Sequence, residues 1–265
     1  MKNLIVLIVI FITSTTVWGQ IGGISGSKLN SVCVDVVDYH KMEFEPGFYF
    51  FSTNTFWDNN SRLSNLFASK DSISNSSGML VRFTYGLFDR LEIGVNVPVD
   101  MCSGSWGIRY VISQSEKFGV AAIAGLDTPF GNSTHDKRIH TEENTIQAGL
   151  GSVVSYQYDE NFSIDVNAQY GRFVRKLKNS KGGSVYLSID AGYYFFARQL
   201  QAIAGFGYQR HNDDSVSQFI VTFYPGITIE TGKNYIIVLS SPFDIYGRNA
   251  AKTFSLSFAL TVTID

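Results

Sequence analysis

The sequence is short of charge and of long apolar runs, and each shortage excludes a class of protein. Charged residues make up 17% of the 265 residues, below the quarter or so that is usual for a soluble globular domain. The 21 Lys and Arg residues form no basic stripe and the formal net charge is −2, so nucleic acid is not expected as a partner. Beyond the first segment, no apolar run reaches the roughly 20 residues that a membrane-spanning helix needs.

Proline and cysteine are also scarce, whereas aromatic residues are abundant. The chain has 5 Pro and 2 Cys, against 21 Phe and 14 Tyr. Two cysteines do not make a disulfide framework, so a Cys33–Cys102 bridge and two separate thiols both stay open. A compact soluble core would not hide so many rings, but the lipid-facing wall of a membrane barrel can display them.

The first residues have the pattern of an export signal. Residues 1–19 combine Lys2, the apolar run Leu4–Ile12 and small residues up to Gly19, which is typical of a signal peptide cleaved before Gln20. We expect residues 20–41 to be either a periplasmic N-terminal tail or a plug folded into a lumen, and residues 42–265 to be the membrane domain. Strands must then cross the bilayer, because only helices and closed barrels satisfy their own backbone in lipid.

From Met42 onward, apolar and polar residues alternate with period two. In Phe162–Tyr170 the even positions are Phe, Ile, Val, Ala and Tyr and the odd positions are Ser, Asp, Asn and Gln, and Phe254–Ile264 repeats the alternation. Segments of this kind have the length of a tilted membrane strand. The sequence predicts an all-β fold, a transmembrane antiparallel up-and-down β-barrel of about 12 strands. The expected strands are 42–57, 78–87, 90–99, 104–114, 117–127, 144–158, 161–172, 183–196, 199–210, 216–230, 233–243 and 250–264.

The predicted connections alternate between short and long. The short ones are Phe88-Asp89, Ser115-Glu116, Asp159-Glu160, Ala197-Arg198 and Thr231-Gly232. The others are Asp58–Ser77, Thr128–Glu143 and Phe173–Gly182, which are long, and Asp100–Ser103, Asn212–Ser215 and Asp244–Asn249, which are modest. Short turns at the periplasmic end and longer loops outside are typical of bacterial outer-membrane barrels, so we expect the chain in the bacterial outer membrane.

One hairpin carries a family resemblance. The run Tyr85-Gly86-Leu87-Phe88-Asp89-Arg90-Leu91-Glu92-Ile93-Gly94, continued to Pro98, and the upstream Glu45-Pro46-Gly47 resemble the outer-membrane family called "MetA pathway of phenol degradation". The motif positions are Tyr85, Gly86, Asp89, Arg90, Glu92, Gly94 and Pro98. The resemblance implies a barrel that passively passes small molecules, aromatic or apolar ones included, without naming the solute.

The partners expected of such a barrel are outer-membrane lipids and the outer-membrane insertion machinery. One departure from the pattern concerns that machinery. The chain ends Thr263-Ile264-Asp265, whereas many barrels of this kind end on an aromatic residue that the insertion machinery reads.

The side chains opposite the apolar parity are the candidates for the lumen. They are Glu43, Glu45, Arg82, Glu92, Arg109, Asp165, Asn167, Gln169, Asp190, Gln201 and Glu230. Charges of both signs predict ion pairs across the lumen, and inward glycines such as Gly94, Gly119 and Gly149 favour a cavity or narrow path. A packed interior without a pore is the equal alternative.

The sequence gives little support for an enzyme. His40, His135, His140 and His211 all lie outside the interiors of the expected strands, where a barrel-wall hydrolase would need its base. His135 and His140 match no zinc spacing. We expect no catalytic residue, no cofactor and no metal. The function expected is a passive channel; a structural or surface-anchoring barrel is the alternative, and an outer-membrane hydrolase is the weakest reading.

Overall fold

The computed structural model describes residues 21–26, 29, 31–68, 72–99, 101, 103–129, 146–175, 183–212, 217–231 and 234–265. The predicted signal peptide, Cys102 of the disulfide considered above, and the loop histidines His135 and His140 lie outside the described residues. Among the described residues, no helix has the length and apolar character to span a membrane.

The described residues form fourteen antiparallel strands, of which β2 has three residues. They are β1 (Met42–Trp57), β2 (Leu63–Asn65), β3 (Ser74–Phe88), β4 (Leu91–Pro98), β5 (Ser103–Gln114), β6 (Phe118–Pro129), β7 (Ile146–Gln157), β8 (Phe162–Arg175), β9 (Gly183–Phe195), β10 (Leu200–Asn212), β11 (Ser217–Glu230), β12 (Tyr235–Ser240), β13 (Phe243–Arg248) and β14 (Ala250–Ile264).

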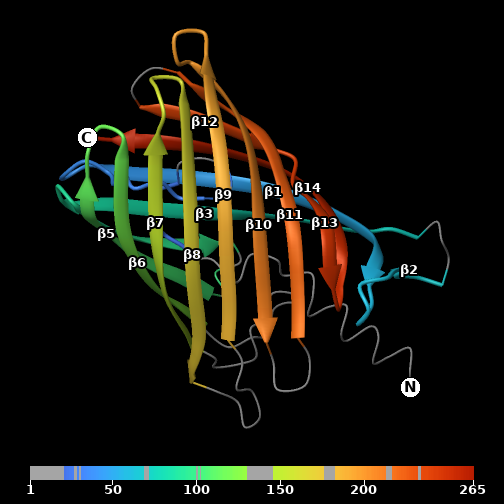
Figure 1. Cartoon of the computed structure of the whole chain (residues 1–265). Coiled ribbons are helices and arrows are strands. Elements are labelled where there is room, and N and C mark those ends of the chain that lie inside the picture. The colour runs from blue at the N-terminus through green and yellow to red at the C-terminus, as the bar shows by residue number, and fades with distance from the viewer. Residues whose placement is uncertain are drawn as a thin grey trace.

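The sheet closes on itself (Figure 1). β14 pairs with β1 along its length, from Met42↔Ile264 to Trp57↔Ala250. β2 and β3 follow one another along β1, and β12 and β13 follow one another along β11. The fourteen strands therefore occupy twelve positions in the wall, and the predicted twelve-stranded barrel is confirmed.

The predicted connection Asp244–Asn249 is wrong, because β13 occupies Phe243–Arg248. The strand predicted at 233–243 is interrupted at Pro242, which has no N–H for the ladder, and then continues as β13. Ser241 N–H donates to the Pro225 carbonyl (3.0 Å) at the interruption, and the turn into β14 is left to Asn249, with a φ of 51°.

The predicted loop Asp58–Ser77 is shorter than expected. β2 lies within it, and β3 begins at Ser74. Three-residue pairing of β2 with the end of β1 extends the wall on this side. The predicted tight turn Ala197-Arg198 is present between β9 and β10, and the turn predicted at Phe88-Asp89 lies one residue later, at Asp89-Arg90, between β3 and β4. Short hairpins share one rim with the C-terminus (Figure 1).

The two faces of the wall differ in chemistry as the alternation predicts. In β8, Val166 and Tyr170 are exposed on the outside, whereas Asp165, Asn167 and Gln169, of the opposite parity, are buried. In β5, Trp106, Ile108 and Tyr110 are exposed while Arg109 is buried. An apolar outer face and a polar inner face are what a barrel in lipid requires.

Candidate functional site: the lumen and its N-terminal segment

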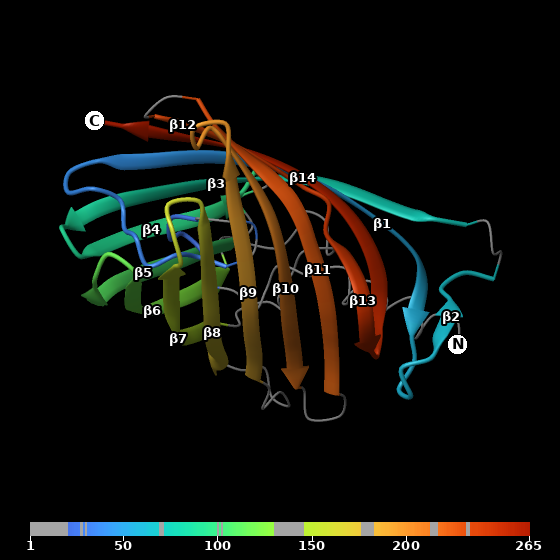
Figure 2. The same cartoon turned by 45° about the horizontal axis from the view of Figure 1, so that its top comes forward.

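The described residues of 21–38, which are 21–26, 29 and 31–38, lie inside the wall and are called here the luminal segment. In Figure 2 the blue trace that leads into β1 turns back from the rim and runs along the inner side of the strands. Backbone N–H groups of the segment donate to wall side chains: Ile21 to Gln169 Oε1 (2.7 Å), Ser31 to Asp190 Oδ2 (2.6 Å) and Val34 to Ser155 Oγ (2.9 Å). The described residues of this segment are therefore bound to the inner face of the wall.

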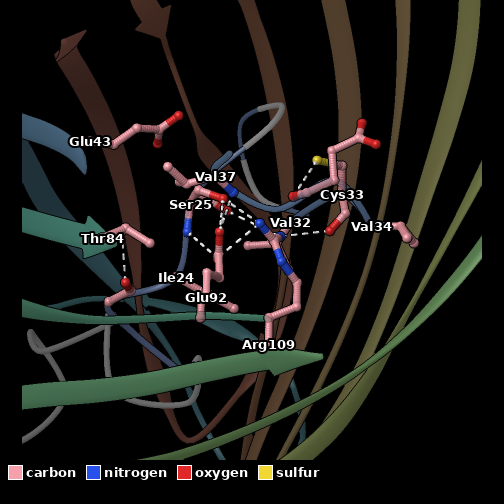
Figure 3. A network of polar contacts seen from close by, with 12 residues as sticks. Ile24, Ser25, Val32, Cys33, Val34, Val37, Glu43, Thr84, Glu92 and Arg109 are labelled. Atoms are coloured by element: carbon pink, nitrogen blue, oxygen red, sulfur yellow. Dashed lines mark hydrogen bonds and ion pairs between the residues drawn. The ribbon is translucent and has the colours of Figure 1, made fainter. Parts of the chain in front are cut away.

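A buried ion pair holds the segment at two points (Figure 3). Glu92 of β4 and Arg109 of β5 are register partners, lie 2.9 Å apart and are both 0% exposed. The Glu92 carboxylate accepts from Ser25 N–H (2.8 Å), Ser25 Oγ (2.8 Å) and Val37 N–H (2.9 Å). Arg109 donates to the carbonyls of Ser25 (3.3 Å) and Cys33 (2.6 Å). The pair therefore binds both arms of the bent luminal segment.

A second charged group lies beside the first. Arg82 of β3 pairs with Glu45 (2.8 Å) and Glu43 (3.2 Å) of β1 and donates to the Ile24 carbonyl (2.7 Å). Thr261 of β14 donates to Glu45. This network ties the seam between β1 and β14 to the luminal segment through one guanidinium.

Between these polar contacts the segment forms an apolar core with the wall. Ile21, Ile24, Val32 and Val34 of the segment cluster with wall residues of β5, β6 and β7. The wall members are Val111, Ala121, Ile123 and Val153, which are 0–2% exposed. A polar lumen alone would not retain a segment in this way, because burial of apolar surface supplies the non-directional part of the attraction.

A row of glycines brings the segment against the wall. Gly94, Gly107, Gly125, Gly149 and Gly171 are successive register partners from β4 to β8. A Cβ on Gly94 would stand 1.9 Å from the carbonyl oxygen of Gly23, which itself has a φ of +79°. A Cβ on Gly107 would stand 2.2 Å from the Gly22 oxygen. The luminal segment thus fills the volume beside the first four of these glycines, whereas Gly171 faces Gln147 and Ser184 of the wall.

The motif hairpin is the docking edge for this part of the chain. Tyr85 Oη and His40 Nδ1 are 2.6 Å apart, and His40 N–H donates to the Gly86 carbonyl (2.9 Å). Glu92 and Gly94 contact the luminal segment as described above. Asp89 and Arg90 form the turn, and Pro98 ends β4. Four of the seven motif positions therefore touch residues 21–41.

The other candidate lumen residues lie on β8 to β11. Asp165 and Asp190 are register partners and are 2% and 0% exposed. Asn167 donates to the Val32 carbonyl (2.8 Å), and Gln201 accepts from Thr228 (3.4 Å). Glu230 accepts from Tyr194 Oη (2.8 Å).

The prediction of ion pairs across the lumen is wrong for Arg82 and Arg109. Arg82–Glu45 and Arg109–Glu92 join neighbouring strands at directly paired positions. The physical reason is that the luminal segment stands between opposite walls, so each guanidinium bonds the nearest carboxylate and the backbone of the segment.

The sequence reasoning missed two sets of inner-face residues. Hydroxyl groups that bind the segment are one: Thr84 donates to the Gly23 carbonyl (2.8 Å), and Ser31 to Ser188 (2.8 Å). Aromatic rings are the other set: Tyr49, Phe51, Tyr186, Tyr194 and Tyr224 share strand parity with inward residues. Tyr49 and Phe51 are stacked, with centroids 5.6 Å apart. Parity was the available signal, since each ring stands two or four residues from a polar inward position.

The described part of the chain shows no metal cluster. Within it, no group of three or more His, Cys, Asp or Glu side chains is arranged to hold an ion. His211 packs edge to face against Phe173, with centroids 5.9 Å apart.

Comparison with known proteins agrees with the barrel. An outer-membrane channel from Pseudomonas putida F1 superposes with a TM-score of 0.70 at 12% identity, over 89% of this chain and 100% of that one. The NanC porin superposes with a TM-score of 0.50 at 9% identity, over 83% and 98%. No curated protein sequence matches the chain. Residues 34–260 match the family described as "Putative MetA-pathway of phenol degradation". The chain therefore belongs to this family of outer-membrane β-barrels.

Proposed function

We propose that this chain is a passive outer-membrane channel for small molecules, aromatic or apolar compounds among them, and that the luminal segment sets the width of its path. The family description refers to phenol degradation, and the related fold from Pseudomonas putida F1 is described as an outer membrane channel.

The observation that carries the proposal is the aromatic part of the inner wall. Hydrogen bonds of the described part of the luminal segment go to wall residues of β3 through β9, Thr84 and Asp190 among them, and the Leu29 side chain lies against Gly226 of β11. The inner face of β1 and β11 carries Tyr49, Phe51 and Tyr224. Aromatic rings attract other rings in offset or edge-on contact at centroid distances of about 4.5–7 Å, so this side suits an aromatic solute.

The test is swelling of liposomes that contain the mature barrel, in phenyl glucoside and in cyclohexyl glucoside. The two neutral solutes differ in the aromaticity of one ring. We expect both to enter, with phenyl glucoside entering faster, and we expect Phe51→Leu together with Tyr224→Leu to reduce the difference. Empty liposomes correct for leakage through lipid.

Transport is excluded if neither solute enters through the wild-type barrel or through a variant whose luminal segment has been displaced. The alternative, a structural barrel that anchors surface loops, would then stand.

A further inference from the structure

The outer wall carries an apolar groove directly behind the glycine row. It has a volume of about 740 Å3 and crosses β3, β4, β5, β6 and β7, within the range of about 300–1,000 Å3 typical of ligand sites. Large outward side chains form its sides: Phe83, Ile93, Trp106, Ile108, Leu126 and Leu150. These six are 39–70% exposed, and none of the residues that line the groove is charged.

Small residues make the floor of this groove. Gly94, Gly107, Gly125 and Gly149 contribute backbone, and Ala124 and Ala148 contribute methyl groups. On the other side of the same glycines lies the luminal segment, with the Gly23 and Gly22 oxygens against Gly94 and Gly107. The wall between is one backbone thick and fully paired from β4 to β8, so the groove is a membrane-side feature with no opening into the lumen.

The surroundings select the occupant. The side chains of the groove have the parity of the lipid-facing wall, so hydrocarbon is the medium in contact with it. Five strands about 4.8 Å apart give the groove a length of about 19 Å, and an acyl tail spans about half of a hydrocarbon core of ~30 Å. The lining of the groove carries no charged residue, so it suits an apolar acyl tail and not a charged headgroup.

We propose that this groove is a binding site for one acyl chain of a membrane phospholipid, held against the glycine row from the membrane side. The chain would fill a hollow that the side chains of the wall leave open, and would back the thin part of the wall on which the luminal segment rests. The inference is independent of transport, because the lipid lies outside the lumen.

Trp106 is a native reporter for this site. It is 44% exposed and lines the groove, whereas Trp57 is 3% exposed. The mature chain in excess detergent is titrated with phosphatidylcholine carrying brominated acyl chains, which quench nearby tryptophan. We expect quenching that saturates at one lipid per barrel, with one adduct in native mass spectra, and we expect Trp106→Phe to abolish the response.

Two matched variants separate the groove from general lipid contact. Ala148→Phe fills the floor of the groove, and Ala204→Phe makes the same change on the exposed outer face of β10. We expect Ala148→Phe to lower the affinity for the lipid at least tenfold and Ala204→Phe to bind it as the wild type does. If Ala148→Phe does not fold, Ala124→Leu takes its place. Quenching that does not saturate, or that is equal in both variants, would overturn the proposal.

Discussion

At the scale of single residues, Glu92 is the side chain on which most contacts converge. It accepts three hydrogen bonds from the luminal segment and pairs with Arg109, and both side chains are 0% exposed. Loss of one partner leaves the other charge buried and unpaired, which costs about 3–5 kcal/mol. We expect Glu92→Ala to lower the free energy of unfolding by about this amount, measured by urea unfolding of the refolded barrel.

Two comparisons make this prediction specific. Glu116→Ala removes a carboxylate from an exposed turn and should leave the unfolding free energy unchanged within about 0.5 kcal/mol. The double variant Glu92→Met/Arg109→Met should regain part of the loss, because no unpaired charge remains. A Glu92→Ala barrel as stable as Glu116→Ala would contradict the role of the pair.

Asp58 supplies a pH-dependent contact at the outer end of β1. Hydrogen bonds from the backbone N–H groups of Arg62 (2.9 Å) and Asn60 (2.7 Å) hold the pKa of the Asp58 carboxyl below its ordinary value of 3.8. Because the folded pKa is the lower one, the carboxylate stabilises the turn above the unfolded pKa and the contribution is lost as pH falls through the folded pKa. We expect the protection factor of the Arg62 amide against hydrogen exchange to fall below about pH 3.8, and Asp58→Asn to remove that dependence.

At the scale of elements, the strands were predictable and the luminal segment was not. The alternation places the strands because one face meets lipid and the other does not. Residues 21–38 have no such period: their fold is set by Glu92, Arg109 and a glycine row whose members are 13 to 24 residues apart in sequence. Period two reveals which way a residue points, but it does not reveal that a distant segment lies against it.

The glycine row leads to a prediction about this element. A methyl group on Gly94 would collide with the Gly23 carbonyl, whereas one on Gly47, an inward glycine of β1, would find Leu80 Cδ1 at 3.4 Å. We expect Gly94→Ala to displace the luminal segment and to raise the swelling rate of liposomes in phenyl glucoside several-fold, and Gly47→Ala to leave it unchanged. Equal rates in the two variants would show that the segment does not limit entry.

At the scale of the whole molecule, the register between the first and last wall strands is the feature to test. Phe50 and Leu256 are paired across the β1–β14 seam, and both face outward. In a background with Cys33→Ser and Cys102→Ser, we expect Phe50→Cys/Leu256→Cys to form a disulfide on oxidation, detected as altered migration of the unfolded chain.

The matched control shifts one partner by two residues. Phe50→Cys/Phe258→Cys places the thiols on a diagonal, with Cα atoms about 7–8 Å apart, beyond the reach of a disulfide. Efficient oxidation of this second pair, rather than the first, would show a different closure of the barrel.

The closed ring has a consequence for the order in which the molecule assembles. The luminal segment precedes β1 in sequence, yet it lies inside a wall that is complete only when the last strand, β14, pairs with β1. Its anchors on β3, β4 and β5 are the strands that follow it first. Either the segment settles on this early sheet and the later strands are laid around it, or it must thread through a finished rim, and the bent, doubly anchored path around Glu92 makes the first order the shorter route.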